Sequence, residues 1–104
     1  MTVVRLETWD FKADVPIASI KEMCDRYLGL KNEIPYIVSM SGGSTGEGFD
    51  DQRQRVVFVI EFENWDDLGR YIEDPTAVAT HADMGSPAVY EGGRFVEYTN
   101  GLWY

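Results

Sequence analysis

Hydrophobic and polar positions alternate at the start of the chain, a pattern that predicts a β-strand from Thr2 to Phe11. Its residues divide into two sets, one for each face of a sheet: Val4, Leu6 and Thr8 against Arg5, Glu7 and Trp9. Similar patterns predict two further strands, from Tyr36 to Ser41 and from Arg94 to Thr99. In the first of these, one face is predicted to carry Tyr36, Val38 and Met40.

The strongest strand pattern lies in the middle of the chain, from Arg55 to Glu63. One face carries four large apolar side chains and the other two valines: Val56, Phe58, Ile60 and Phe62 against Val57 and Val59. A strand that is apolar on both faces is covered on both faces. Helices of so short a chain can cover one side of the sheet, so we expect a second copy of the protein to cover the other.

A helical pattern follows the first strand. Asp14 is a candidate N-cap and Pro16 suits the first turn. Gly29 is a candidate C-terminal stop, and Pro35 lies beyond the predicted end. Between these signals one apolar stripe recurs at helical intervals: Ile17, Ile20, Cys24, Tyr27 and Leu28.

A second helical region follows the central strand. Asn64 is its predicted N-cap, and its predicted apolar face consists of Trp65, Leu68 and Ile72, with Tyr71 beside them. Asp74-Pro75 interrupts the helix, which resumes from Thr76 to Asp83. Residues 85–93 are predicted to be irregular or to form one more turn. The predicted order is βαββαβ, an α+β, ferredoxin-like fold with an antiparallel sheet and helices on one face.

Length and charge limit the classes of partner. The 104 residues predict a single domain spanning 1–104. Asp and Glu number 18 against 9 Lys and Arg, and this net charge of −9 argues against nucleic acid or an acidic membrane as partner. The longest strictly apolar run, Val56 to Ile60, is far shorter than the ~20 residues of a membrane span. The first residues do not resemble a secretion signal, so we expect a cytoplasmic protein.

Several kinds of chemistry lack their sequence signals. The chain has one cysteine and one histidine, so we predict no internal disulfide, no metal site and no cofactor. Cys24 lies in the apolar stripe, where we expect it to pack as a small hydrophobe rather than to act as a nucleophile. The segment 42–51 is predicted to be a loop, because it holds four glycines and three acids. It is not predicted to bind phosphate, because it lacks the lysine of a phosphate loop. Its acids do not have EF-hand spacing and predict at most weak cation contacts: Glu47, Asp50 and Asp51.

Four segments carry a resemblance to a known family by their order and spacing: Ile34-Pro35, Val57 to Leu68, Tyr71 to Pro75, and Phe95 to Tyr98. The chain resembles the dimeric α/β-barrel, stress-responsive barrel family over nearly its whole length. The resemblance implies a homodimer in which two sheets face each other, and a pocket between each sheet and its helices. Some members are cofactor-independent polyketide cyclases or hydroxynitrile lyases, and others are boiling-stable plant proteins that build larger rings.

The plant cyclases of this family have a pocket tyrosine on each of two helices, and Tyr27 and Tyr71 stand at those places. The cyclases also have a His-Pro-x-His segment whose second histidine is the general base. Here that position is Ala77, and two strand histidines of the cyclases are replaced by Arg5 and Val56. The resemblance thus implies a substrate pocket lined by residues that include Arg5, Trp9, Val56, Phe58 and Ala77.

His81 is the only imidazole in the chain and lies one helical turn beyond Ala77. It is a candidate for a displaced general base, because its unperturbed pKa near ~6.5 suits that role. The alternative is a histidine at the surface without a task. Tyr27 and Tyr71 are candidates for catalytic residues beside it, and the alternative is that both are core aromatics whose hydroxyls reach solvent.

Arg5 also has two interpretations. It could hold a carboxylate or enolate oxygen of a substrate. Alternatively, it could lie at the rim and pair with Glu7 or Glu97.

The sequence is compatible with two functions that belong to different classes. The leading one is a small-molecule pocket protein, a cofactor-independent cyclase or lyase acting on an aromatic or polyketide-like substrate. The alternative is a non-catalytic stress-responsive protein whose role is its stable homo-oligomeric assembly. A pocket into which four side chains point favours the first: Tyr27, Tyr71, Arg5 and His81. A pocket filled by core aromatics favours the second: Phe58, Phe62 and Trp65.

Overall fold

The computed structural model describes residues 1–46 and 52–104. The elements follow one another as β1 (Val3–Phe11), α1 (Ile17–Leu28), α2 (Leu30–Glu33), β2 (Ile37–Thr45), β3 (Gln52–Phe62), α3 (Trp65–Glu73), α4 (Pro75–Met84) and β4 (Tyr90–Thr99). The predicted ferredoxin-like βαββαβ order is confirmed. The short helix α2 is added to it, and the second helical region is divided into α3 and α4 as the Asp74-Pro75 break predicts.

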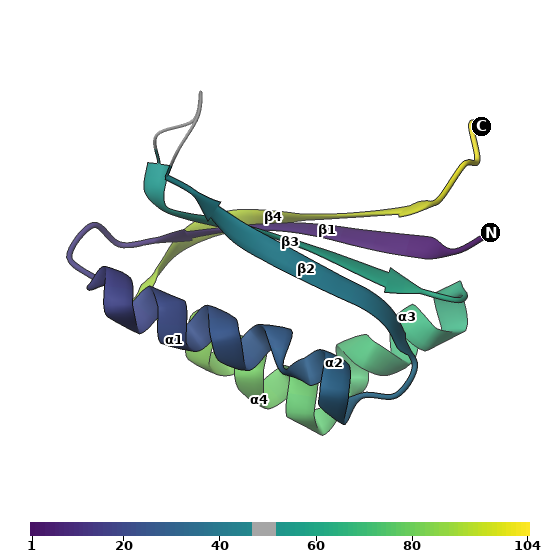
Figure 1. The fold of residues 1–104 in the computed structure, drawn as a ribbon, viewed down its shortest axis with the longest axis horizontal. Helices are drawn as coiled ribbons and strands as arrows, with labels where there is room; N and C mark the ends of the chain where they lie inside the picture. Colours follow the sequence, from purple (N-terminus) through teal and green to yellow (C-terminus); the bar gives the residue numbers. More distant parts are fainter. Residues whose placement is uncertain (47–51) are drawn as a thin grey trace.

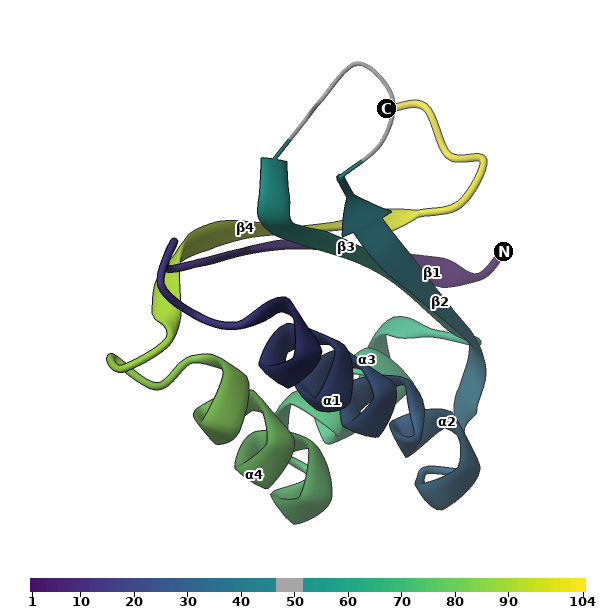
Figure 2. The ribbon, with the colours of Figure 1, turned by 60° about the vertical axis from the view of Figure 1, so that its left-hand side comes forward.

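The four strands form one antiparallel sheet in the order β2-β3-β1-β4. All the helices lie against one face of this sheet, below it in Figure 1, and the opposite face is left uncovered. Figure 2 shows α1 and α4 lying beside each other under the sheet. None of the helices formed by residues 1–46 and 52–104 is long and apolar enough to cross a membrane.

The inner face of the sheet forms the core with the helices. The predicted inner set on β3 is buried there, with exposed fractions of 3% or less: Val56, Phe58, Ile60 and Phe62. On β1 it is the set containing two charges that faces the helices: Arg5, Glu7 and Trp9. The outer face carries Leu6, Val59 and Val96, which are paired across three neighbouring strands and partly exposed. This is the second apolar face that the sequence predicts.

The predicted face of β2 is wrong. The strand begins at Ile37, which is buried, whereas Val38 is exposed and Tyr36 precedes the strand. The pairing with β3 is irregular between Ile37 and Ser39, and such a bulge inserts one residue and shifts the alternation. Met40 pairs with Ile60 and packs against the core from its half-buried position.

The predicted loop over 42–51 is too long, because β2 continues to Thr45 and β3 already begins at Gln52. Gly42 pairs with Phe58, and a Cβ placed at Gly42 would lie 2.5 Å from the Phe58 ring and 2.7 Å from the Val57 carbonyl oxygen. The glycine is therefore a requirement of close strand packing rather than a loop signal. The candidate cation ligands Glu47, Asp50 and Asp51 lie outside the described residues. The predicted irregular segment 85–93 is also too long, since β4 begins at Tyr90.

The predicted cap of α3 is confirmed, and α4 has a cap that the sequence analysis did not predict. The Asn64 side chain accepts a hydrogen bond from the Asp67 N–H, and the Asp74 side chain accepts one from the Thr76 N–H, with Pro75 as the first residue of α4. The buried face of α3 differs from the prediction. It consists of Leu68 and Tyr71, whereas Trp65 and Ile72 are about half exposed.

The start and the end of α1 correct three predictions. The N-cap is Pro16 without a side-chain hydrogen bond, so Asp14 does not cap the helix. Gly29 keeps a right-handed helical backbone and leads directly into α2 instead of stopping the chain. The buried stripe of α1 is Ile20, Met23 and Tyr27, and Ile17 is exposed. Tyr27 belongs to both the predicted and the observed stripe, and its ring packs against Phe58 of β3.

Gly93 tests the close packing of β4 on β1. A Cβ placed there would lie 2.1 Å from the Thr8 carbonyl oxygen, whereas a Cβ at the neighbouring Gly92 would meet no atom within 4 Å. We expect Gly93→Ala to lower the free energy of unfolding by about 1–3 kcal/mol through overpacking. Gly92→Ala, the matched control, should leave it unchanged or raise it by up to about 1 kcal/mol. Urea unfolding of both variants measures this, and equal stability would contradict the strand pairing.

Candidate active site

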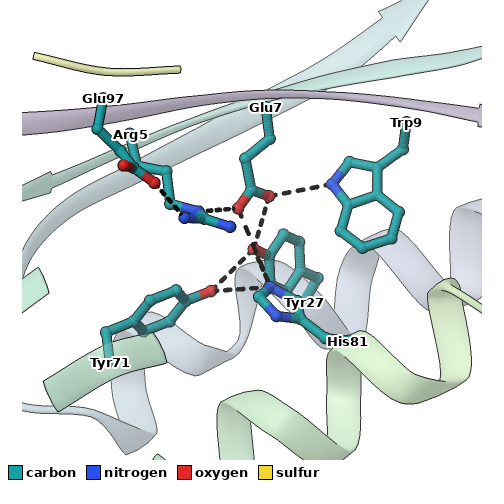
Figure 3. A network of polar contacts seen from close by, with 7 residues as sticks. All are labelled: Arg5, Glu7, Trp9, Tyr27, Tyr71, His81 and Glu97. Carbon is teal, nitrogen blue, oxygen red and sulfur yellow. Dashed lines mark hydrogen bonds and ion pairs between the residues drawn. The ribbon is translucent and has the colours of Figure 1, made fainter. Parts of the chain in front are cut away.

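A carboxylate, that of Glu7, lies at the centre of the inner face with no solvent exposure. Three donors reach it from nearby side chains (Figure 3). Arg5 Nε donates to Oε2 at 2.6 Å, Trp9 Nε1 donates to Oε1 at 3.0 Å, and the Tyr27 hydroxyl donates to Oε1 at 2.6 Å. A buried charge is costly unless it is paired and hydrogen-bonded, and these donors meet that condition for Glu7.

Arg5 connects β1 to β4. Its guanidinium donates to Glu97 as well as to Glu7, and it lies 4.5 Å from the centre of the Phe95 ring. Burial lowers the pKa of Arg5, but the hydrogen bond and charge of Glu7 outweigh this and raise the pKa above its ordinary value. Arg5 therefore pairs with both Glu7 and Glu97, as the second interpretation of this residue predicts. It does not lie at a rim, because its side chain is buried.

Two tyrosines and the histidine meet beside Glu7, each from a different helix. Tyr27 comes from α1, Tyr71 from α3 and His81 from α4 (Figure 3). The Tyr27 hydroxyl lies 2.6 Å from His81 Nε2 and accepts a hydrogen bond of 2.8 Å from the Tyr71 hydroxyl. His81 Nε2 lies 3.4 Å from the Tyr71 hydroxyl and 4.0 Å from Glu7 Oε2.

The surroundings change the proton affinities of these groups. Burial raises the pKa of Tyr27, and the negative charge of Glu7 raises it further. Burial also raises the pKa of Tyr71, although the hydrogen bond to Tyr27 acts in the opposite direction. Burial lowers the pKa of His81 below its ordinary value, with Glu7 raising it and Arg5 lowering it as smaller effects. At neutral pH the site therefore combines a neutral imidazole with two protonated phenols, a set that can accept and donate protons.

The other predicted pocket residues surround this cluster. The Trp9 ring packs against the rings of Tyr27 and His81. Its centre lies 6.2 Å from the centre of the Tyr27 ring and 5.6 Å from that of the His81 ring. Ala77 is buried on α4 one turn before His81. Val56 and Phe58 pair with Trp9 and Glu7 across β3 and β1.

An apolar groove of about 320 Å³ lies between α1 and the strands β2 and β3. Its lining includes Ile20, Cys24, Leu28, Gly42, Val56 and Phe58. The ring of Phe58 packs edge-on against the ring of Tyr27, with centres 4.6 Å apart. The groove and the polar cluster are thus neighbours that this ring pair separates.

Cys24 lines this groove from α1, half buried. Burial, and to a smaller extent Asp25, raises the pKa of its thiol to about 11. A thiol that stays protonated at neutral pH is a weak nucleophile.

The structure brings together Arg5, Trp9, Tyr27, Tyr71 and His81, with Ala77 beside them. Sequence reasoning missed Glu7 as a site residue and considered it only as a partner of Arg5. A signal was present, because opposite charges two positions apart on a strand face shared with Trp9 indicate a buried pair. Among residues 1–46 and 52–104, no cluster of three or more potential metal ligands occurs.

Comparisons with known proteins identify a family. The family model described as "Stress responsive A/B Barrel Domain" matches residues 3–98. No curated protein matches the chain.

Solved structures show the same fold at low sequence identity. A hydroxynitrile lyase from Passiflora edulis is 17% identical, with a TM-score of 0.81 over 99% of this chain and 97% of that one. A dimeric, ferredoxin-like protein of unknown function from Bacteroides fragilis is 20% identical, with a TM-score of 0.74 over 93% and 94%. SnoaB, a cofactor-independent oxygenase from Streptomyces nogalater, is 12% identical, with a TM-score of 0.75 over 98% and 95%.

The lowered pKa of His81 has a consequence for stability. The unfolded chain takes up a proton on this residue near pH ~6.5, whereas the folded protein does so only at lower pH. Stability from this source is therefore complete above about pH 6.5 and is lost as the pH falls from that value through the lower pKa of the folded protein. We expect the difference in free energy of unfolding between the protein and a His81→Gln variant to shrink from pH 7.5 to pH 5. Urea unfolding across this range measures it, and a difference that grows on acidification would mean a raised pKa.

Proposed function

This chain belongs to the family of stress-responsive A/B barrel domains, and from that premise we propose that it is a cofactor-independent enzyme, a cyclase or lyase acting on a small aromatic or polyketide-like molecule. The observation that carries the proposal is the 2.6 Å contact between His81 Nε2 and the Tyr27 hydroxyl beside the Tyr71 hydroxyl. Two proteins of the same fold, one named a hydroxynitrile lyase and one a cofactor-independent oxygenase, support a chemistry carried by side chains.

His81 is the proposed general base. Its lowered pKa keeps the imidazole neutral and able to accept a proton at neutral pH. Tyr27 and Tyr71 keep their protons, because burial raises both pKa values. Their hydroxyls act in catalysis by holding the imidazole of His81 in place. Arg5 adds a fixed positive charge behind them, which favours an enolate-like intermediate.

The apolar groove is the proposed site for the body of the substrate. Its volume of about 320 Å³ lies at the lower end of the range of ligand pockets. Val56 and Phe58 form part of its wall, and both are among the pocket residues that the sequence predicts. Since the ring of Phe58 separates the groove from Tyr27, this binding mode requires the ring to turn aside when a substrate enters.

The second candidate function is the non-catalytic assembly protein. It is favoured by the uncovered sheet face, where Leu6, Val59 and Val96 are between 36% and 51% exposed. On that hypothesis the buried polar cluster is a structural connection between sheet and helices. Either function includes pairing of two copies through this face, as an α/β barrel, and the dimeric neighbour from Bacteroides fragilis supports that arrangement.

The catalytic hypothesis is tested with variants of the cluster on a panel of phenolic, polyketide and cyanohydrin compounds. Loss of a positioned general base costs about 10²–10⁴ in rate, so His81→Ala should lose that much turnover with the fold intact. Tyr71→Phe should lose less if the hydroxyl only orients the substrate. Thr80→Ala, one residue from His81 and with its hydroxyl bonded to the Thr76 carbonyl rather than to the cluster, is the control and should retain full turnover.

Binding is measured in parallel by NMR titration of the same compounds. Compounds that shift the NMR signals of Phe58 and Val56, and that displace one another from the groove, support the proposal. Full turnover in His81→Ala would remove His81 from the mechanism. Absence of both binding and turnover across the panel would favour the assembly function.

The proposed dimer has its own test. Val59→Asp places a charge at the centre of the outer sheet face, and we expect it to dissociate or unfold the protein. Ile72→Asp makes the same change at an exposed position on α3, 46% exposed, and should leave the dimer intact. Sedimentation measures both, and an interface of about 1,200–2,000 Å² should hold the unmodified protein together at micromolar concentration. A folded, unmodified monomer at that concentration would contradict the prediction.

A further inference from the structure

The hydroxyl of Tyr27 has three polar neighbours but only one hydrogen. Glu7 Oε1 and His81 Nε2 each lie at 2.6 Å, and the Tyr71 hydroxyl lies at 2.8 Å. A phenol oxygen donates one hydrogen bond and accepts up to two. One neighbour of Tyr27 must therefore accept its hydrogen, and the other two must each bring a hydrogen of their own.

Glu7 is the neighbour that accepts. Its carboxylate already receives N–H donors from Arg5 and Trp9, and an ionised carboxylate can only accept. It also competes best for the phenol hydrogen, because a hydrogen bond to a charged acceptor is stronger than one to a neutral imidazole. If the hydrogen turned toward His81 instead, Glu7 Oε1 would face the phenol oxygen at 2.6 Å with no hydrogen between them, in a site without solvent exposure.

We propose that Glu7 is a positioning residue that acts through Tyr27 to fix His81 in the tautomer with its hydrogen on Nε2, leaving Nδ1 as the basic nitrogen. The Tyr71 hydroxyl brings the other hydrogen to Tyr27. The 3.4 Å separation of Tyr71 from Nε2 fits this arrangement, because the hydrogens of both groups point at the Tyr27 oxygen.

The tautomer decides where a substrate meets the base. In Figure 3 the second ring nitrogen of His81 lies farther from the Tyr27 hydroxyl than Nε2 does. The His81 side chain is 23% exposed, in contrast to the fully buried Glu7. A proton taken from a weakly acidic C–H or O–H group of a substrate is accepted by Nδ1, Nε2 keeps its own hydrogen, and the hydrogen bond from Tyr27 to Glu7 is unchanged. The resulting imidazolium is stabilised by Glu7 Oε2, 4.0 Å from Nε2.

The role in catalysis rests on the proposed function, but the tautomer itself does not. It is measured on the free protein, so failure of one can be told from failure of the other. Because the chain has a single histidine, long-range ¹H–¹⁵N NMR of histidine-labelled protein reports one imidazole only. We expect the Nε2–H form above the titration midpoint of His81. A predominant Nδ1–H form would overturn the proposal.

Variants of Glu7 test its part in the arrangement. In Glu7→Gln the charge that holds the Tyr27 hydrogen is lost, so at least half of the population should change to the Nδ1–H form. The titration midpoint of His81 should fall as well. Among the described residues, the charged groups that then face it are Arg5 on β1 and, behind Arg5, Glu97 on β4, while the helices contribute the phenols of Tyr27 and Tyr71. An unchanged tautomer in a folded Glu7→Gln variant would overturn the proposal.

Two further variants separate this role from a merely structural one. Glu97→Gln removes an acid that also pairs with Arg5 but does not contact Tyr27, and it should leave the tautomer unchanged. Glu7→Asp keeps the charge and should retain more of the Nε2–H form than Glu7→Gln does. If Glu7→Gln does not fold, Tyr27→Phe gives the decisive result: the exchange of the Nε2 hydrogen with water should become faster, and an unchanged rate would contradict the connection through Tyr27.

Discussion

The carboxylate of Glu7 is removed from water, and this burial requires hydrogen-bond donors from two elements at once. β1 supplies two of them, Arg5 and Trp9, and α1 supplies the third, Tyr27. Removal of one partner from a buried, paired charge costs about 3–5 kcal/mol, so each of these elements is held in place by the same carboxylate. The helices therefore do not pack on the sheet as an apolar layer alone. They are also aligned to it by a polar connection that tolerates little displacement.

A buried polar cluster of this kind is a poor means of gaining stability, because well-packed apolar residues of similar volume often serve as well. Its value lies in the fixed direction of each hydrogen. In the proposed arrangement every polar side chain that contacts Glu7 or Tyr27 has a defined donor or acceptor role, and among these described residues His81 is the one that is partly open to solvent. A histidine held by a network at one nitrogen is suited to proton transfer at the other. This is the physical reason to favour chemistry over a purely structural role for the cluster.

The two faces of the sheet divide the tasks of the protein. The inner face combines the apolar side chains of β3 with the charges of β1 and holds the candidate active site. The outer face carries the aliphatic side chains of Leu6, Val59 and Val96 in register. Because successive residues of a strand point to opposite faces, neighbouring side chains on β1 lie alternately beside the candidate site and on the uncovered surface. Arg5 and Leu6 are neighbours in sequence, yet they belong to the interior and to the uncovered surface respectively.

The sequence by itself determined the order of elements, the antiparallel sheet and the buried face of β3, because these follow from local periodicity, from the cap Asn64 and from the break at Asp74-Pro75. It also indicated Tyr27, Tyr71 and His81 as candidates. Only the tertiary structure decided that they meet, since each comes from a different helix and no local pattern sets the distance between helices. The bulge in β2 and the part played by Glu7 were decided there too. The role of a carboxylate in a strand cannot be assigned until the donors that surround it are known, and those donors lie up to 20 residues away in the chain.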